Sequence, residues 1–470
     1  MKTRKEHDFL GEMEVPADAY YGIQTLRAAQ NFHDISGITI GDYPNYRKAL
    51  AMVKWAAARA NMSLGLLDEK LARAIMKACE EIIDGKFADQ FPVDMMQGGA
   101  GTSTNMNINE VVANRALEIL GHQKGEYQFC HPNNHVNMSQ STNDAYPTAF
   151  HLAFIFDNEE LVRDLAELVE SLRKKGKEFS HIIKMGRTQL QDAVPMTLGQ
   201  EFEAFAVTME EEIERLNQNA RLFLEVNMGA TAIGTGINSE PGYSQACVKA
   251  LRVISNEDIS LATDLIEATP DSGPMIMYSS ALKRMAIKLS KICNDLRLLS
   301  SGPRCGLNEI NLPPMQPGSS IMPGKVNPVI PEVVNQICFR IIGNDTTICF
   351  AAEGGQLQLN VMEPIMVHTI FRSVKIMQKA MERLRTLCID GITANEQHCK
   401  DLVLNSIGIV TALNPTLGYE NSARIAKRAL KENRSVYDLV LEEKLLTKQE
   451  LDELLQPERM IKPQKFYKKS

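Results

Sequence analysis

The sequence predicts an all-α protein built around a bundle of long helices. Between about residue 150 and residue 390, apolar residues recur at intervals of three and four, the spacing of one face of an α-helix. Three stretches of this region, 200–228, 275–301 and 365–390, contain no glycine or proline, so we expect each to form an uninterrupted helix. Helices of about 25 residues are twice the usual length, and helices with such stripes pack at shallow angles into bundles.

Each long helix is predicted from its own apolar stripe, which we interpret as a core-facing surface. Some stripes continue where a single chain could not easily cover them, which indicates a bundle shared between subunits. The stripes are Leu161, Leu165, Leu168 and Leu172; Phe202, Phe205, Met209, Ile213, Leu216, Ala220 and Phe223; Leu282, Met285, Leu289, Ile292, Leu296 and Leu299; and Val367, Ile370, Val374, Met377, Met381 and Leu384.

The two ends of the chain carry shorter patterns, and the length of 470 residues exceeds what one ordinary core can organise. Near the N-terminus, helical patterns cover residues 45–64 and 68–83. After about residue 395, short helices are expected, broken at Asn414-Pro415 and at Gly418. We therefore predict three domains, which are a mixed helical domain (1–140), a long-helix bundle (141–395) and a small helical domain (396–470).

The composition excludes several classes of protein. A net charge of −7 argues against nucleic acid and anionic membranes as partners. No run of about 18 apolar residues could span a bilayer, and the first residues lack the apolar core of a signal peptide. Nine scattered cysteines without a C-x-x-C pair are typical of reduced thiols and disfavour a zinc site. We expect a cytoplasmic protein.

Three polar segments interrupt the helical pattern, at residues 98–110, 131–144 and 186–202. Each ends by opening a helix, and each presents serine, threonine or asparagine near that start. One interpretation is simple N-capping, for which Thr102, Ser141 and Thr142 are suitable. Capping explains one hydroxyl per helix, however, and not clusters of three to five polar side chains. Because hydroxyls, amides and backbone N–H groups at helix starts bind anions, the alternative is a site for a small carboxylate.

Other common motifs do not fit these segments. The run GGAGTS lacks the G-K-[ST] ending of a phosphate-binding loop, and GATAIGTG follows no predicted strand of a dinucleotide-binding fold. His131 and His135 are four residues apart, as metal ligands on a helix can be. Pro132 and two asparagines lie between them and disfavour a regular helix, so we expect no metal site there.

A loop with the sequence GSSIMPGKVNP, residues 318–328, lies between two helical regions. Lys325 supplies a positive charge for a carboxylate, and two glycines leave backbone N–H groups approachable. Ser319 and Ser320 lack the G-x-S-x-G elbow and the nearby histidine of hydrolases. A serine surrounded by hydrogen-bond donors can instead act as a base. The alternative that the sequence leaves open is a rigid surface turn.

This loop closely resembles the signature loop of the aspartase/fumarase superfamily. The resemblance extends over the whole chain, through VPADAYYGIQTLRA, GGAGTSTNMNINE, SQSTND, GRTQLQDAVPMTLGQEF and SSGPRCGLNEINLP. Within the superfamily the details are similar to the aspartate ammonia-lyases. Thr142 stands where class II fumarases usually carry a second serine, Gln189 stands where they usually carry a histidine, and NPVIPEVVNQ after the loop is aspartase-like.

The resemblance implies an all-helical homotetramer that reversibly converts L-aspartate to fumarate and ammonium, without a required organic cofactor. It implies that Ser319 is the base that removes the Cβ proton and that the loop is a mobile lid. The implied site lies at a junction of three subunits. By position, Thr102, Ser141, Thr142 and Ser320 would bind the β-carboxylate, Lys325 and Asn327 the α-carboxylate, and Asn143 and Thr188 the ammonium group.

Two rival classes remain open from the sequence. One is a fumarate hydratase, which adds water in place of ammonia. The other is a non-catalytic helical oligomer, against which the presence of Ser319, Ser320 and Lys325 argues. Whether a divalent metal activates the protein does not follow from the residues.

Overall fold

The computed structural model describes residues 2–461. The chain divides into two compact units, each made of three separate segments. Unit 1 comprises residues 1–163, 214–286 and 339–377, and unit 2 comprises 164–213, 287–338 and 378–470. The division into three consecutive domains stays a prediction.

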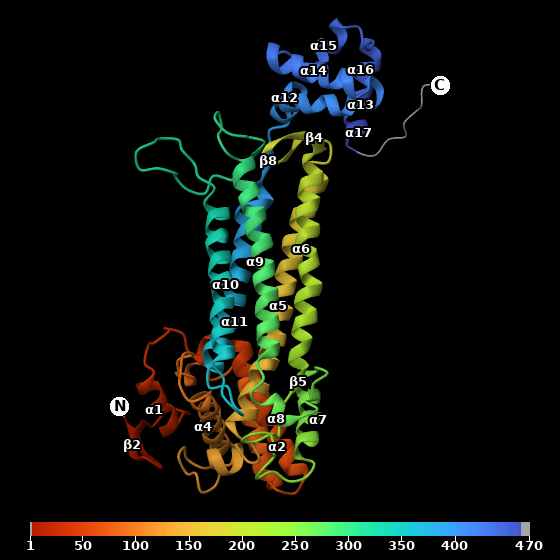
Figure 1. Ribbon diagram of the computed structural model, residues 1–470. Coiled ribbons are helices and arrows are strands. Elements are labelled where there is room, and N and C mark those ends of the chain that lie inside the picture. Colours follow the sequence, from red (N-terminus) through yellow and green to blue (C-terminus); the bar gives the residue numbers. More distant parts are fainter. Residues whose placement is uncertain (1, 462–470) are drawn as a thin grey trace. The chain divides into compact units, whose positions relative to one another are not determined.

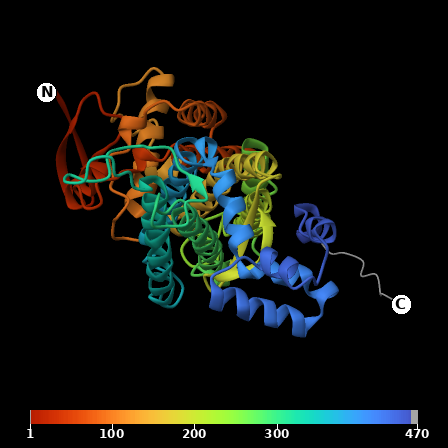
Figure 2. The same cartoon turned by 90° about the horizontal axis from the view of Figure 1, so that it is seen from above.

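The predicted long helices are present, which confirms the all-α fold class. The boundary between the two units falls within every one of them. Within each unit, segments of these helices lie alongside one another (Figures 1 and 2). None of the helices in residues 2–461 is long and apolar enough to cross a membrane. The long helices are α5 (Thr142–Glu178), α6 (Leu198–Ala220), α9 (Gly273–Leu299), α10 (Val329–Glu353) and α11 (Glu363–Leu387).

Apolar burial holds the long helices together, as their stripes predict. Leu165, Leu289 and Leu384, from three different helices, are all 0% exposed, and full burial of one leucine side chain contributes about 2 kcal/mol relative to exposure. Helix α6 ends before its apolar stripe does, because residues 221–224 tighten into a 3₁₀ turn before a short strand. The prediction of an uninterrupted helix up to residue 228, which rested on the absence of glycine and proline, therefore overestimated the length of this helix.

Polar side chains also link neighbouring helices of the bundle. In unit 2, Arg173 of α5 donates to Glu210 of α6 at 2.8 Å between Nη2 and Oε2. In unit 1, Asn344 Nδ2 of α10 donates to Ser373 Oγ of α11 at 2.9 Å. Such bonds are directional, so they add a preferred register to helix contacts that apolar burial alone leaves adjustable.

Unit 1 also holds the N-terminal helices, and the predicted helices at 45–64 and 68–83 agree with α2 and α3 within one residue at each end. Fourteen of the twenty positions of α2 are buried, so it forms the centre of this region. The elements of this unit outside the bundle are β1 (Thr3–Asp8), β2 (Gly11–Pro16), α1 (Ile23–Asn31), α2 (Pro44–Ser63), α3 (Glu69–Ile83), α4 (Thr102–Ile119), β5 (Glu225–Val226), α7 (Tyr243–Ser255), β6 (Ser260–Leu261) and α8 (Leu265–Ala268).

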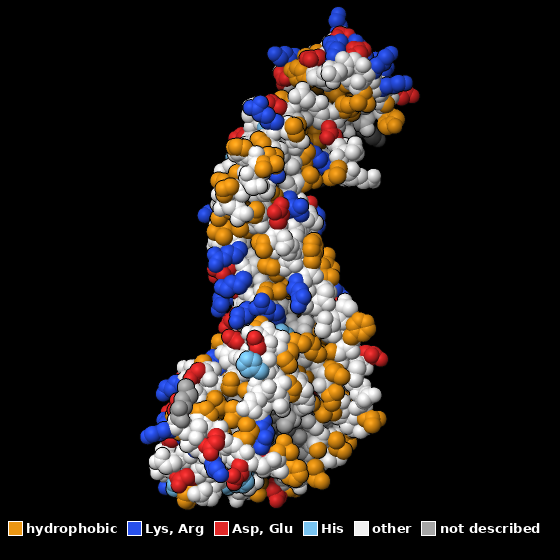
Figure 3. All heavy atoms as spheres, turned by 90° about the vertical axis from the view of Figure 1, so that its left-hand side faces the viewer, with side chains coloured by type: hydrophobic (Ala, Val, Ile, Leu, Met, Phe, Trp, Pro, Cys, Tyr) orange, Lys and Arg blue, Asp and Glu red, His pale blue; other side chains and the backbone are white. Residues whose placement is uncertain are grey.

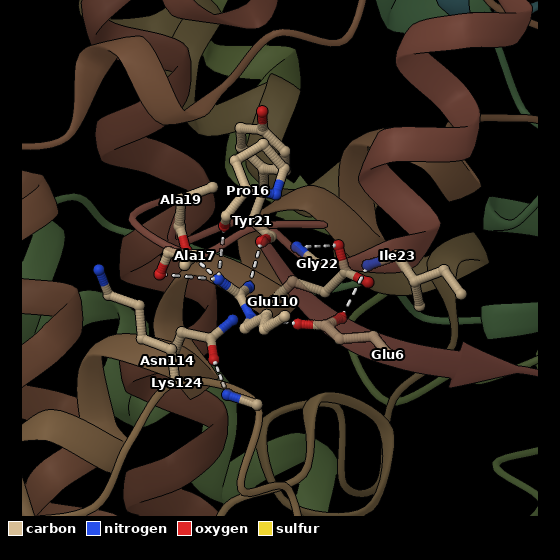
Figure 4. A network of polar contacts seen from close by, with 12 residues as sticks. Glu6, Pro16, Ala17, Ala19, Tyr21, Gly22, Ile23, Glu110, Asn114 and Lys124 are labelled. Carbon is tan, nitrogen blue, oxygen red and sulfur yellow. Dashed lines mark hydrogen bonds and ion pairs between the residues drawn. The ribbon is translucent and has the colours of Figure 1, made fainter. Parts of the chain in front are cut away.

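Two buried carboxylates anchor the start of α1 (Figure 4). Glu110 of α4 accepts hydrogen bonds from the backbone N–H groups of Gly22, Gln24 and Thr25, and Glu6 of β1 accepts one from Ile23. The first N–H groups of a helix have no partner within the helix, so these carboxylates satisfy them. Burial raises the pKa of Glu110 to about 7, while its hydrogen bonds oppose the shift.

Unit 2 also contains a β-hairpin and the C-terminal helices. The C-terminal helices share a core that includes Leu413, Ile425 and Leu439. Contrary to the predicted break at Asn414-Pro415, α13 continues through Pro415 and ends before Gly418, because a proline in the last turn interrupts little of a short helix. The elements outside the bundle are β3 (Ile183–Thr188), β4 (Gln191–Thr197), β7 (Ile310–Asn311), β8 (Thr393–Ala394), α12 (Glu396–Asn405), α13 (Val410–Leu417), α14 (Tyr419–Glu432), α15 (Val436–Glu442), α16 (Lys448–Leu454) and α17 (Pro457–Met460).

Candidate active site

The first polar segment places Thr102 at the first position of α4. The residue before it, Gly101, has a φ of 87°, and a Cβ there would lie 2.5 Å from the ring of Tyr146. Only glycine fits this left-handed, crowded position. The side chain of Thr102 is exposed, and α4 has no side-chain cap. The capping interpretation is thus wrong for Thr102, whose hydroxyl is left for another partner.

The second polar segment brings Ser141, Thr142 and Asn143 together at the start of α5. Ser141 Oγ accepts from the backbone N–H of Asn143 at 3.2 Å, so Ser141 does cap the helix. Asn143 Nδ2 donates to the carbonyl of Ala232 at 2.8 Å. The amide is therefore oriented with Oδ1, its acceptor, away from that carbonyl. A side-chain amide oxygen in this position can accept from a cation such as an ammonium group.

A buried carboxylate, that of Asp144, fixes this helix start against a neighbouring loop. Its oxygens accept from the backbone N–H groups of Ser141 at 2.9 Å, Gly229 at 3.0 Å and Thr231 at 2.9 Å. Burial raises the pKa of Asp144 to about 6, and these hydrogen bonds oppose the shift. Asp144 thus fixes the position of the helix start that carries Ser141 and Thr142.

Behind Thr142 lies a second buried charge, Lys54 of α2, which is 0% exposed. Its Nζ donates to the side-chain oxygens of Asn105, Asn137 and Gln140 at 2.6, 3.1 and 2.8 Å. Asn105 Nδ2 in turn donates to Thr142 Oγ1 at 3.1 Å. Sequence reasoning missed Lys54, although a single lysine inside the apolar run ALAMVKWAAA is a recognisable signal.

In unit 2, Thr188 lies at the end of β3, at the tip of the β3–β4 hairpin. The turn residues Gln189 and Leu190 have φ angles of 53° and 61°, the left-handed region that a two-residue hairpin turn requires. Non-glycine residues adopt this conformation at a cost of about 1–2 kcal/mol each. The turn exposes Thr188 and Gln189 to solvent.

The hairpin is tied to the segment that precedes the serine loop. Glu309, which is 0% exposed, receives Arg187 Nη1 at 2.6 Å on Oε1 and Lys184 Nζ at 3.0 Å on Oε2. Both partners belong to β3. A buried carboxylate between two cations is strongly coupled to its partners, so this contact fixes the base of the loop relative to the hairpin.

The serine loop closes on itself at its two ends. Gly318 N donates to the carbonyl of Lys325 at 2.7 Å, and Asn327 Nδ2 donates to the carbonyl of Gly318 at 2.8 Å. A Cβ at Gly318 would lie 2.7 Å from that lysine carbonyl oxygen, so a side chain there would open the closure. Asn327 keeps a second N–H for another acceptor.

Ser319 lies within this closed loop and receives two backbone donors. Its Oγ accepts from the N–H groups of Ile321 at 3.2 Å and Met322 at 3.1 Å. Donors aimed at an oxygen favour its negatively charged form, so they ease deprotonation of the hydroxyl. Ser319 and the exposed Lys325 both line a hollow of about 400 Å³ formed by the loop.

The site residues thus form two groups. Thr102, Ser141, Thr142 and Asn143 belong to unit 1, and Thr188, Ser319, Ser320, Lys325 and Asn327 belong to unit 2.

The two histidines that the sequence places four residues apart each accept a hydrogen bond from a backbone N–H. His131 precedes a short π-helical turn, Pro132–Val136, and His135 lies within it. His131 Nδ1 accepts from the N–H of Asn133 at 3.0 Å, and His135 Nδ1 accepts from the N–H of His131 at 2.8 Å. Among residues 2–461, no group of three or more histidine, cysteine or acidic side chains is arranged to hold a metal ion.

Comparison with known proteins identifies the family. A family described as "Lyase" matches residues 11–343, and one described as "Fumarase C C-terminus" matches residues 409–462. An aspartate ammonia-lyase of Helicobacter pylori is 60% identical over 465 residues, which cover 99% of each chain. The chain belongs to the aspartase branch of the aspartase/fumarase superfamily.

Solved structures of the superfamily share the fold of this aspartase-family chain. A fumarate lyase:delta crystallin from Brucella melitensis, bound to cobalt, has a TM-score of 0.95 and 53% identity, covering 98% of this chain and all of its own. A class II fumarase from Schistosoma mansoni has a TM-score of 0.89 and 34% identity, covering 98% and 99%. The chain is thus similar in fold to both, and closer in sequence to the aspartate ammonia-lyase.

Proposed function

We propose that the protein is an aspartate ammonia-lyase that converts L-aspartate reversibly to fumarate and ammonium. The observation that carries the proposal is the 60% identity to an aspartate ammonia-lyase over nearly the whole length of both chains. The rival activity, fumarate hydration, is less supported, since identity to the class II fumarase is 34%. The intact serine loop favours an enzyme over a non-catalytic oligomer.

In the proposed mechanism, Ser319 Oγ removes a proton from Cβ of aspartate. The backbone N–H groups of Ile321 and Met322 are placed to stabilise the serine alkoxide before transfer. The electron pair left on Cβ delocalises into the β-carboxylate, which becomes a dianionic aci-carboxylate. Collapse of this intermediate forms the Cα–Cβ double bond and breaks the Cα–N bond, so the amino group leaves as ammonia. The ammonia takes the proton back from Ser319 Oγ and becomes ammonium.

The hydroxyl cluster is assigned to the β-carboxylate. Thr102, Ser141, Thr142 and Ser320 supply donors whose hydrogen bonds strengthen as the carboxylate gains its second negative charge. Binding that is tighter in the transition state than in the substrate accelerates the reaction. The exposed hydroxyl of Thr102, which caps no helix, supports its assignment to a ligand.

The other end of the substrate is assigned to four residues. The Lys325 ammonium and the second amide N–H of Asn327 would bind the α-carboxylate. Asn143 Oδ1 and the Thr188 hydroxyl oxygen would accept from the substrate ammonium group. Because side chains and backbone supply every step of this proton transfer, the mechanism requires no organic cofactor.

A homotetramer with sites shared between subunits is part of the proposal. Between Val333 and Phe350, the exposed positions of α10 include one charged residue, Arg340. Phe339 and Phe350 are 60% and 74% exposed, and Figure 3, which faces the side where α10 lies in Figure 1, shows hydrophobic side chains on that surface. A solvent-facing helix normally carries many charges there, so this face supports packing against a second copy of the chain.

A cytoplasmic location is also proposed. All nine cysteines are free thiols, and seven of them are buried. Reduced, unpaired cysteines in this number are typical of a reducing compartment.

The proposal is tested by incubating the purified protein with L-aspartate and measuring fumarate and ammonium. We expect the two products in equal amounts. No fumarate from L-aspartate, by a protein that is shown to be assembled, would contradict the proposed function.

A further inference from the structure

The interior of unit 1 contains a lysine that the mechanism does not use. Lys54 lies on α2 within residues 49–58, a run that is otherwise apolar, and its side chain is fully buried. Burying a charged amine is costly, and an apolar residue at such a position is often at least as stabilising. Core packing therefore does not by itself account for this lysine, and its hydrogen bonds indicate what it does.

Lys54 determines which way the amide of Asn105 faces. A lysine ammonium only donates, so the atom of Asn105 that lies 2.6 Å from Nζ must be the oxygen, Oδ1. This is the shortest of the three lysine contacts. The neutral amine also has N–H bonds, so it can keep this contact in either protonation state.

The orientation of Asn105 in turn determines the role of Thr142. With Oδ1 held by the lysine, the amide N–H₂ of Asn105 donates to two acceptors, Asn137 Oδ1 and Thr142 Oγ1, each at 3.1 Å. Among the hydrogen bonds of residues 2–461, Thr142 Oγ1 takes part only as an acceptor. Its own proton is therefore left for a partner outside these residues, on a side chain that is partly exposed.

We propose that Lys54 and Asn105 are positioning residues that hold the Thr142 hydroxyl as a donor toward the substrate carboxylate. This inference rests on the proposed function, because it states that a residue of that site donates a hydrogen bond to the substrate. If the Asn105 amide were reversed, Thr142 would donate to Oδ1 and present lone pairs to the carboxylate. Substrate and hydroxyl would then repel each other.

The sharpest test is Asn105→Asp. This substitution keeps the shape of the side chain and an acceptor for Lys54, but it replaces the donor that faces Thr142 and Asn137 with an oxygen. We expect kcat for L-aspartate to fall at least about tenfold, with a smaller change in KM, since the donor matters most for the aci-carboxylate. Asn114→Asp is a matched control, because Asn114 is a buried asparagine on the same helix and donates to the carbonyl of Tyr20.

A double-mutant cycle separates this role from a structural one. Thr142→Val removes the hydroxyl through which Lys54 and Asn105 are proposed to act. In the Thr142→Val background, Asn105→Asp should change kcat less than twofold. A full, independent loss in that background, or wild-type kcat for Asn105→Asp alone, would overturn the inference. If Asn105→Asp fails to assemble, Lys54→Met in the same cycle gives the same two outcomes.

Binding of succinate, a dicarboxylate that cannot eliminate, distinguishes this inference from the proposed function. Calorimetry on the assembled protein should show weaker succinate binding for Asn105→Asp than for wild type, and no further weakening in the Thr142→Val background. A wild-type protein that binds succinate but does not deaminate aspartate would contradict the proposed function, and the binding cycle would still decide the inference. Equal succinate affinity of wild type and Asn105→Asp would count against it.

Discussion

At the scale of single residues, the reactivity of Ser319 depends on its immediate donors. An isolated serine hydroxyl is a poor base at neutral pH. The two backbone N–H groups that donate to Ser319 Oγ favour its deprotonated form, which is the form that can act as a base. The sequence of the serine loop suggests that Ser319 is a base but does not establish it. The donors are backbone N–H groups, and the direction in which they point depends on the conformation of the loop. The structure supplies the direction of those N–H groups.

Replacing this serine gives the first prediction. Ser319→Ala should assemble normally, since the side chain lies on a surface loop, and should lose at least about 10² in kcat, the contribution of a positioned base. Steady-state kinetics with L-aspartate, beside size measurement of the assembled protein, checks this. Turnover near the wild-type level would remove Ser319 from its assigned role.

Lys54 gives a prediction about stability and pH. Burial lowers the pKa of Lys54 to about 7 and the Asp144 carboxylate opposes the shift, whereas an unfolded lysine titrates near 10.4. Between these values the unfolded chain holds more protons than the folded chain, so raising the pH favours the folded state. The free energy of unfolding of wild type should therefore rise relative to Lys54→Met by about 2 kcal/mol between pH 7 and pH 9.

Denaturant titrations of both proteins at a fixed protein concentration measure this difference. The other ionisable groups that face Lys54, namely Asp144, Cys79 and Cys247, are present in both proteins, so their own titration largely cancels. A stability difference that stays constant from pH 7 to pH 9 would show that Lys54 titrates at its ordinary value.

At the scale of elements, the closed loop depends on Gly318. The close approach of the Lys325 carbonyl oxygen leaves no room for a Cβ. Gly318→Ala should therefore open the closure and lower kcat/KM at least tenfold, about 1.4 kcal/mol or more, with little change in the thermal midpoint. Gly324→Ala is the comparison, because a Cβ at Gly324 would meet no atom within 4 Å and tests only the φ of 81°. Equal losses from both substitutions would contradict the steric argument.

The helices were predictable from the sequence and the hairpin was not. Stripes such as Leu282 to Leu299 repeat over many turns, so the helical period dominates any single residue. The β3–β4 hairpin contains Gly186 and Pro195, which interrupt the alternation that identifies strands. Its turn uses Gln189 and Leu190, two residues with little preference for positive φ. Contacts with the rest of unit 2, such as those of Glu309, stabilise a turn that local preference does not predict.

The site was partly predictable for a related reason. Hydroxyls at helix starts and the serine loop are visible as clusters in the sequence, so they could be proposed as a site. Capping by Thr102 was one of two interpretations that the sequence left open, because the conformation of Gly101, which ends the loop before α4, depends on tertiary contact with Tyr146. The positioning residues Lys54 and Asn105 act through contacts 51 positions apart, and local patterns carry no information about those.

At the scale of the whole molecule, the proposed assembly requires that residues from different chains meet in one active site. The resemblance places each site at a junction of three subunits. If Thr188 and Ser319 of one site come from different chains, mixing Thr188→Val with Ser319→Ala after reversible dissociation should leave about a quarter of sites with both residues intact, by independent assignment. Activity should then rise from near zero toward that fraction.

The control for this experiment is each variant dissociated and reassembled alone, which should stay inactive. Native mass measurement shows whether mixed oligomers have formed. Persistent inactivity of mixed oligomers would mean that each site takes both residues from the same chain.

The most direct measurement is the fate of fumarate in ammonium buffer. Aspartate and malate arise from the same carbon–carbon double bond and differ only in the group that is added, so their ratio compares the lyase with the hydratase. We predict that the wild-type protein forms L-aspartate, with negligible malate, and that product formation ceases when ammonium is omitted. Malate as the main product, with or without ammonium, would contradict the assignment of this chain as an aspartate ammonia-lyase.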